Sequence, residues 1–412
     1  MERTAMHKIQ LNGLRWVAGT MLGASLAVAT IGQQAIAEDD YEWPRYFNVI
    51  TPAVGTGNHS LAVAWTTELS SQTPTRVRVL PAPNGFSRAS WLNTDEGRIA
   101  LMQASEYYDQ MDAVDGFASR DGGPADTRAI ALAMVTPWGY MVRGDSDIES
   151  IHDIGPGTRI AYAGSSAFLL VGIDALLAYL DLDHDEVELV EVGSFGANTA
   201  VVTEGRADVA ITGPVAGPSY EAEASPHSIR WLELPEPAED PEAYERYRNV
   251  NLGYVPMEVS SGAGTAHGLN MDHAFQMYHV RGDDDPDFVY HLVKWMDEAY
   301  DSFKGDFTHA HMMSMDNLKL FLEHGAMQPL HEGAIRYLEE KGGWNEAFQE
   351  RQEALVELAQ SRVASYQEAM ALAADQGINV SPGNESWVNF WQQYREENGI
   401  AQPYGELVRA LD

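Results

Sequence analysis

The feature that most constrains the fold of this chain is a recurring order of short apolar strand, small-residue turn and helix, which begins at Tyr46. Residues 47–50 are predicted to form a buried strand, residues 55–58 a glycine-rich turn and residues 60–69 a helix. The same order recurs further along, at residues 76–80, 84–87, 88–92 and 99–103. Strands that alternate with helices predict an α/β domain with a largely parallel sheet.

A second unit of the same kind is predicted to begin near Pro137. Residues 218–258 are rich in Pro and Glu and are predicted to run over the surface. A strand at 273–280 and an amphipathic helix at 286–302, opened by a proline in its first turn, follow that segment. The other elements expected in this unit are strands at 138–142, 159–162, 188–192 and 209–211, a turn at 164–166, and helices at 168–180 and 197–204.

The end of the chain differs in character and predicts a helical extension over residues 344–412. Residues 346–373 lack Pro and Gly and are rich in Ala, Glu, Gln and Leu, which predicts one long helix. Gly377 and Pro382 interrupt it, and a shorter helix is expected over 385–397. We expect the extension to pack on the body of the chain; dimerisation or contact with a membrane partner are the alternatives.

The N-terminus has the features of a secretory signal peptide over residues 1–37. Lys8 and Arg15 are followed by an apolar stretch over residues 16–31 and by Ala-Ile-Ala at 35–37. The rest of the chain has no long apolar run, so the mature protein is expected to be soluble, not membrane-spanning, and periplasmic. The chain contains no cysteine, which excludes disulfides, thiol nucleophiles and a lipoprotein anchor.

The charge balance is strongly acidic, with 61 Asp and Glu against 26 Lys and Arg and a formal net charge of -35. Loss of residues 1–37 removes three basic residues and one acidic residue, so the mature charge is -35 minus 2, or -37. Repulsion on this scale favours a saline environment, where salt screens it; a merely acidic protein is the alternative. Nucleic-acid binding is disfavoured because the sequence offers no basic stripe to displace counterions.

The sequence gives no sign of an enzyme, a metal site or a cofactor. It contains no nucleophile elbow, no phosphate-binding loop and no dinucleotide fingerprint after a strand. Its 13 His lack the helical spacing of zinc ligands. The acidic run Asp283-Asp284-Asp285 could hold a hard cation, but we expect it to be solvated.

A motif near the end of the predicted body suggests a family. Residues 328–342, Gln-Pro-Leu-His-Glu-Gly-Ala-Ile-Arg-Tyr-Leu-Glu-Glu-Lys-Gly, resemble the C-terminal signature of TAXI-family TRAP transporter solute-binding proteins. Glu332 stands where that signature has Pro. Residues 50–59, 84–87, 96–103, 143–154 and 204–210 resemble further segments of the family in the same order, so the resemblance covers about residues 46–343. Within residues 328–342, His331 and Arg336 are expected to have a structural role and to bond backbone carbonyls or a carboxylate.

The resemblance implies a two-lobed periplasmic-binding-protein fold of type II with a ligand cleft. Lobe one is expected over residues 46–136 plus 256–343, and lobe two over 137–255. The implied function is capture of a small organic acid, of the glutamate-like or dicarboxylate class, and its delivery to TRAP membrane subunits without chemistry. An exported sensor that partners a receptor ectodomain is the alternative, since capture would be the same.

The predicted ligand residues lie in turns at helix N-termini and at strand ends. Backbone N–H groups there are unsatisfied and favour a carboxylate. The family usually has Tyr-Tyr where this chain has Asn58-His59, which suggests a smaller or more polar solute. Gln103 could instead bond the next loop, and Trp138 could be an ordinary core residue. The full set is Gly55, Thr56, Gly57, Asn58, His59, Asn84, Gly85, Phe86, Ser87, Gln103, Trp138, Ser165, Ser166 and Phe195.

Overall fold

The computed structural model describes residues 41–54, 56–163, 167–307 and 309–411, without the side chains of Ala167, Phe168 and Phe195. The predicted signal peptide lies outside the described residues. Residues from Tyr41 onward form one compact unit. Within the described ranges, no helix combines the length and the apolar character needed to cross a membrane.

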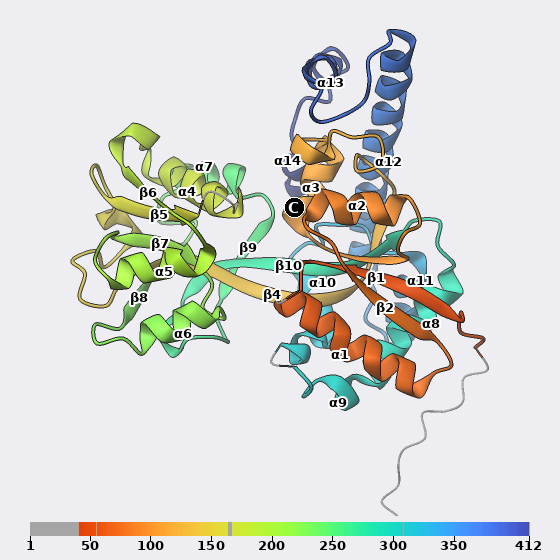
Figure 1. The fold of residues 1–412 in the computed structure, drawn as a ribbon, viewed down its shortest axis with the longest axis horizontal. Helices are drawn as coiled ribbons and strands as arrows, with labels where there is room; N and C mark the ends of the chain where they lie inside the picture. Colours follow the sequence, from red (N-terminus) through yellow and green to blue (C-terminus); the bar gives the residue numbers. More distant parts are fainter. Residues whose placement is uncertain (1–40, 55, 164–166, 308, 412) are drawn as a thin grey trace, which may run out of the picture. The chain divides into compact units, whose positions relative to one another are not determined.

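The first sheet has the strand order β2-β1-β3-β10-β4 (Figure 1). β1 pairs in parallel with β2 and β3, whereas β10 runs antiparallel to β3, β4 and β9. Its parallel part therefore comes from the strand–turn–helix repeats of the sequence. The strands are β1 (Tyr46–Thr51), β2 (Arg76–Pro81), β3 (Ile99–Gln103), β4 (Thr127–Arg143), β9 (Tyr254–Glu258) and β10 (Asn270–Arg281).

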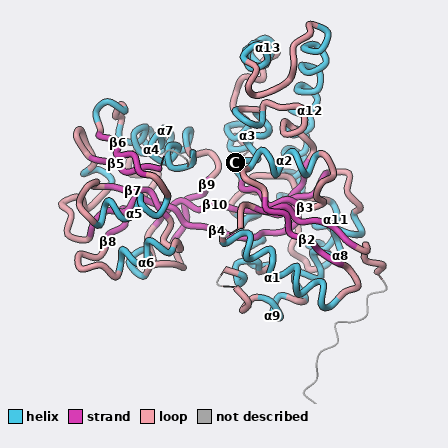
Figure 2. The backbone as a smooth tube through the Cα atoms, in the orientation of Figure 1, coloured by secondary structure: helices cyan, strands magenta, loops and turns pink. Residues whose placement is uncertain are grey.

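The second sheet begins on the same strand, because the 17-residue β4 runs through both sheets (Figure 2). The C-terminal half of β4 pairs antiparallel with β7 and β8, and β5 pairs in parallel with β6 and β7. The additional strands are β5 (Arg159–Ala163), β6 (Glu188–Val192), β7 (Val209–Thr212) and β8 (Ile229–Leu232). The chain thus has the two-lobed periplasmic-binding-protein fold with a C-terminal helical extension.

Helices cover both faces of each sheet and build the cores. On the first sheet, α1 (Gly57–Gln72), α8 (Pro286–Glu298) and α11 (Glu332–Glu340) share one apolar cluster. The other cluster of this sheet contains α3 (Ala104–Asp112), α10 (Met315–Glu323), α12 (Glu346–Asp375) and α14 (Tyr404–Arg409). On the second sheet, α4 (Ala167–Leu180) and α7 (Pro241–Val250) pack on one face, and α5 (Phe195–Thr203) and α6 (Gly217–Glu223) on the other.

The prediction that residues 218–258 run over the surface is wrong. This stretch contains α6, β8, α7 and β9. Its prolines are compatible with these elements: α6 and α7 each carry Pro in the first turn, where no intrahelical N–H partner is lost. Pro256 lies in β9, which among the described residues pairs with β10 alone. The missing N–H of this proline therefore interrupts no hydrogen bonds to a second neighbouring strand.

The extension packs on the body of the chain, as the sequence predicted. Trp387 and Trp391 of α13 (Glu385–Glu397) donate their indole N–H groups to the carbonyls of Ala118 (2.9 Å) and Asp112 (3.0 Å). The buried Asp112 carboxylate at the end of α3 accepts from the Tyr404 N–H at 2.9 Å. The same carboxylate lies 3.4 Å from Arg362 and 3.1 Å from Arg395. Three helices of the extension therefore meet at one buried acid.

Candidate ligand site

The candidate site is a row of side chains on one face of β10. Residues 272, 274 and 276 of β10 share a face because side chains alternate along a strand. Residues directly opposite on neighbouring strands share that face too. The register pairs Asp272 with Trp138 and Pro256, Ala274 with Thr136 and Tyr254, and Gln276 with Met134 and Gln103. The row spans about 13 Å from residue 272 to residue 276.

At one end of the row, Gln276 lies under the N-terminus of α1. The Asn58 amide donates to Gln276 Oε1, and Gln276 Nε2 donates to Thr136 Oγ1 at 3.1 Å. Asn58 Oδ1 is buried and has no hydrogen-bond partner among the described residues. Thr56 caps α1 by accepting the His59 N–H at 3.2 Å, so the first turn of the helix, at Gly57 and Asn58, faces this end of the row.

The predicted Gln103, opposite Gln276, reaches the middle of the row, where its side chain bonds Tyr254. Gln103 is the N-cap of α3 and donates to Ser105 Oγ at 2.5 Å. A hydrogen bond from Gln103 opposes the rise in pKa that burial gives the Tyr254 hydroxyl. The loop before β9 comes very close here: a Cβ at Gly253 would lie 2.7 Å from the Ser105 backbone N, so only glycine fits.

At the other end of the row, Asp272 forms a buried polar cluster with α7. Its Oδ2 accepts from the Tyr247 hydroxyl and from the Asn251 amide. Arg248 Nη1 lies 4.0 Å from Asp272 Oδ1. Burial raises the pKa of the Asp272 carboxyl to about 6, because a charge without solvent is disfavoured there. The sequence analysis missed this cluster, since the strand was predicted to begin one residue after Asp272.

The N-terminus of α2 (Gly85–Asn93) lies against a carboxylate of the chain itself. The Glu106 side chain is so near Gly85 that a Cβ there would lie 2.7 Å from Glu106 Oε1. The buried Arg88 pairs with the same carboxylate. Asn84 caps this helix by accepting the Ser87 N–H at 2.9 Å. The ligand role of residues 84–87 stays a prediction.

Of the other predicted ligand residues that the structure describes, Phe86 and His59 contact residues outside the row. Phe86 packs edge-on against Phe117, with 6.3 Å between ring centroids. His59 Nδ1 lies 2.9 Å from the hydroxyl of the buried Thr51 at the end of β1. Ser194 caps α5 through the Ala197 N–H, and the Phe195 side chain is outside the description. Gly55, Ser165 and Ser166 lie outside the described residues.

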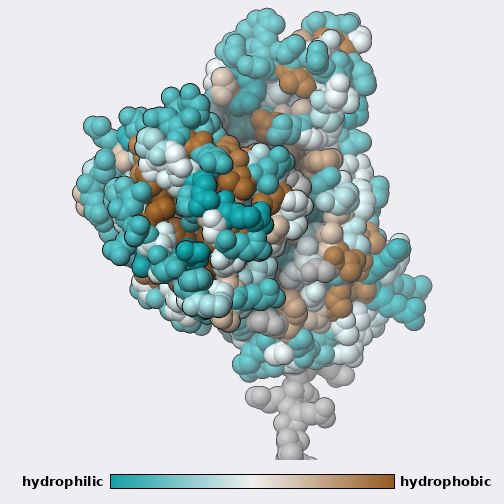
Figure 3. Space-filling model, turned by 60° about the vertical axis from the view of Figure 1, so that its left-hand side comes forward, coloured by the Kyte–Doolittle hydropathy of each residue, from teal (hydrophilic) through white to brown (hydrophobic). Residues whose placement is uncertain are grey.

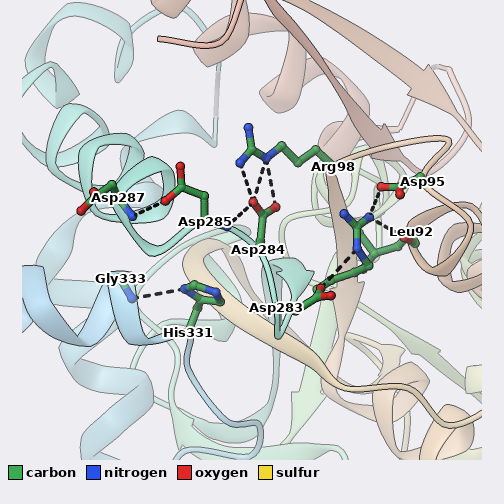
Figure 4. A network of polar contacts seen from close by, with 10 residues as sticks. Leu92, Asp95, Arg98, Asp283, Asp284, Asp285, Asp287, His331 and Gly333 are labelled. Atoms are coloured by element: carbon green, nitrogen blue, oxygen red, sulfur yellow. Dashed lines mark hydrogen bonds and ion pairs between the residues drawn. The ribbon is translucent and has the colours of Figure 1, made fainter. Parts of the chain in front are cut away.

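In the acidic run at 283–285, Asp283 and Asp285 are exposed, as the sequence suggested, whereas Asp284 is buried in the ion pair with Arg98 that Figure 4 shows. Arg98 donates to both oxygens of Asp284, at 3.0 Å from its Nε. Arg281 lies 3.6 Å from Asp283, and Asp285 Oδ1 accepts from the Asp287 N–H at 2.9 Å. Among the described residues, no group of three or more His, Asp or Glu is placed to hold a metal ion.

The signature at 328–342 is scaffold. His331 is the N-cap of α11 and its Nδ1 accepts the Gly333 N–H at 3.2 Å, as Figure 4 shows. Arg336 bonds a carboxylate, as predicted, with Nη1 2.7 Å from Asp287.

Comparison with known proteins identifies the family. The NMT1-like family model matches residues 57–342, which is more than half of the chain. The chain belongs to the NMT1-like family. The matched region contains every element of the row on β10 and ends before α12. A comparison with curated protein sequences finds no significant match.

Several solved structures are similar to this member of the NMT1-like family. A TctC solute-binding protein from Polaromonas has 12% identity and a TM-score of 0.46, over 78% of this chain and 99% of that one. The aliphatic sulphonate binding protein SsuA from Escherichia coli has 11% identity and a TM-score of 0.40, over 73% and 88%. MatC from Rhodopseudomonas palustris, with bound malate, has 11% identity and a TM-score of 0.41, over 79% and 99%.

Proposed function

We propose that this chain is the extracytoplasmic solute-binding protein of a TRAP transporter of the TAXI family. It captures a small organic acid, of the glutamate-like or dicarboxylate class, on the face of β10 and passes it to the membrane subunits. Residues 46–136 plus 256–343 form one lobe and residues 137–255 the other. The signal at residues 1–37 exports the protein to the periplasm, where it binds without catalysis and without a cofactor.

The observation that carries this proposal is the row from Gln276 to Asp272, with the N-terminus of α1 at one end. Helix N–H groups and amide side chains bind a carboxylate without a cationic residue, which suits a strongly acidic protein. The Asn58 and Gln276 amides can both turn by 180° and keep their two hydrogen bonds, with the Thr136 hydroxyl then donating. Asn58 would then present an N–H group where its buried, unpartnered oxygen now lies.

The test is calorimetric titration of the mature chain in high salt with glutamate, 2-oxoglutarate and small sulfonates. Gln276→Ala removes the link between Asn58 and Thr136. We expect the dissociation constant of the acid that binds to rise about tenfold, the effect of one hydrogen bond to a charged group. The matched control is Gln393→Ala, an exposed glutamine on α13, which should leave the constant unchanged.

Two results would contradict the proposal. One is that no acid binds, while an uncharged solute does. The other is that Gln276→Ala and Gln393→Ala bind the acid equally well. A gene for a multi-span TRAP permease beside this one would support transport, whereas a neighbouring histidine kinase would favour the sensor.

A further inference from the structure

A small cavity opens beside the Asp272 end of the row. Its walls include Trp138, Tyr140, Asn251, Tyr254 and Asp272, so it is continuous with the row through two of the row's aromatic residues. The cavity volume is about 20 Å³. That is room for one water-sized group, since a single water needs about 10–15 Å³ by the same measure.

Two residues of the cavity wall carry a buried oxygen that lacks a donor. Asp272 is 4% exposed and Asn251 is 3% exposed. Asp272 Oδ1 and Asn251 Oδ1 have no hydrogen-bond partner among the described residues. The Asn251 amide cannot turn to correct this, because its Nδ2 donates to Asp272 Oδ2. Buried acceptors without a donor are unfavourable, and a ligand that supplies donors gains what they lack.

The neighbouring cationic side chain, Arg248, does not donate a hydrogen bond to these two oxygens. Arg248 lies 4.0 Å from Asp272 Oδ1, beyond hydrogen-bond distance, and its Nη1 donates at 2.6 Å to the Tyr254 carbonyl. The cavity walls are aromatic, and such rings attract a cation through their faces. A second carboxylate would meet two acceptors and a negative charge here, so this end of the row excludes it.

We propose that this cavity binds the ammonium group of the solute, so that the ligand is an amino acid or another amino-bearing acid and not a simple dicarboxylate. This inference rests on the proposed function and deepens it. The ammonium group donates to Asp272 Oδ1 and Asn251 Oδ1, and the acid group of the same solute lies along the row towards the Asn58–Gln276 end.

The test compares pairs of acids that differ only in the amino group, by calorimetry on the mature chain. The pairs are L-glutamate with glutarate and taurine with ethanesulfonate. In the pair that binds, we expect the acid with the amino group to have a dissociation constant at least about tenfold lower than its partner. This is the effect of one charged hydrogen bond. Glutarate or ethanesulfonate binding equally well or better would overturn the inference and leave the proposed function standing.

The variant Asp272→Asn isolates the cavity. Its oxygen can keep the bonds from Tyr247 and Asn251, so its NH₂ group replaces Oδ1 in the cavity. We expect the preference for the amino member to disappear. The matched control is Asp240→Asn on the exposed N-cap of α7, where Asn caps as well as Asp, and it should keep the preference. An undiminished preference in Asp272→Asn would overturn the inference.

A second measurement does not depend on the choice of acid. Ammonium chloride should raise the melting temperature more than sodium chloride at the same concentration, and this difference should vanish in Asp272→Asn. If no acid of either pair binds but the ammonium effect is present, the proposed organic-acid function fails while the amine subsite stands. Equal effects of the two salts, or a larger effect of sodium, would overturn the subsite.

Discussion

At the scale of single residues, Asp272 makes a prediction about pH. Its carboxyl has a pKa of about 6 in the fold, against an ordinary value of 3.8, because burial disfavours the charged form. The charged form therefore opposes folding above about pH 6, by about 3 kcal/mol, and this effect disappears as the pH falls towards 4. Tyr247 and Arg248 of α7 and Tyr140 and Tyr254 of the sheets surround it.

Asp272→Asn should accordingly be more stable than the unchanged chain near neutral pH and should lose that advantage near pH 4. Urea unfolding at several pH values measures this, with Asp240→Asn as the control that shows no such trend. A variant that is less stable than the parent near neutral pH, by the same measurement, would contradict the assignment of a buried charged acid.

His279 predicts a loss of stability in mild acid. It is fully buried, its ring stacks on Tyr107 at 5.9 Å, and its Nε2 lies 3.0 Å from Gln328 Oε1. Burial lowers its pKa to about 4, so the unfolded chain takes up a proton near pH 6.5 that the fold refuses. Stability contributed by the neutral ring is therefore lost as the pH falls from about 6.5 to 4.

His279→Gln removes the side chain that takes up this proton when the protein unfolds. The unfolding free energy should then fall less steeply with acid, by up to about 1.4 kcal/mol per pH unit in that window. The nearby His273, whose pKa burial also lowers to about 4, serves as a positive control through His273→Gln. Equal slopes for His279→Gln and the parent would contradict a neutral buried ring.

The residue scale also shows what sequence could predict about the candidate site. Asn58, Gln103 and Trp138 were singled out from the sequence, and the structure brings the first two to the Gln276 end of the row and Trp138 to the Asp272 end. Gln276, Thr136 and Asp272 could not be found in this way. Their common face depends on the register of β10 against β4, which joins segments more than a hundred residues apart, and nothing local in the sequence sets it.

At the scale of elements, the bounds of a helix or strand could be predicted where the residues of the segment itself determine its structure. β3, β6 and α13 have the predicted bounds, and β6 and α13 end directly before the turn residues Gly193 and Asn398. Only residues 138–142 of the 17-residue β4 were predicted as a strand, since Pro137 was interpreted as the start of a unit. Proline is tolerated there because β10 pairs with this strand around His273, whereas the pairing with β7 begins only at Gly139.

The extension makes a prediction at this scale. Asp112 holds the buried Arg362 and the partly buried Arg395, so Asp112→Ala would leave two guanidinium groups without this counter-charge. Removing one partner of a buried ion pair typically costs about 3–5 kcal/mol. We expect faster amide exchange and proteolysis in α13 and α14, with β1 to β3 unaffected. Asp375→Ala, at the exposed end of α12, is the control; equal protection of α13 in both variants would contradict this role for Asp112.

At the scale of the whole molecule, the net charge of -35 dominates. Hydrophilic residues predominate on the face shown in Figure 3, with apolar residues in small patches between them. Self-repulsion opposes the compact state, and salt screens it. The melting temperature should therefore rise as sodium chloride increases from about 0.05 to 1 M, over which the screening length falls several-fold. Choline chloride should act alike; a flat or falling curve would contradict a charge-limited fold.

The most direct test of the central claim is amide hydrogen exchange with and without the acid that binds most tightly. We expect protection at the start of α1, at the β3–α3 junction and in the loop from α7 to β9, the segments that surround the row on β10. Another pocket exists in the extension, lined by Val114, Trp391 and Arg395. Protection confined to α13 and residues 113–118 would place the ligand there and contradict the account.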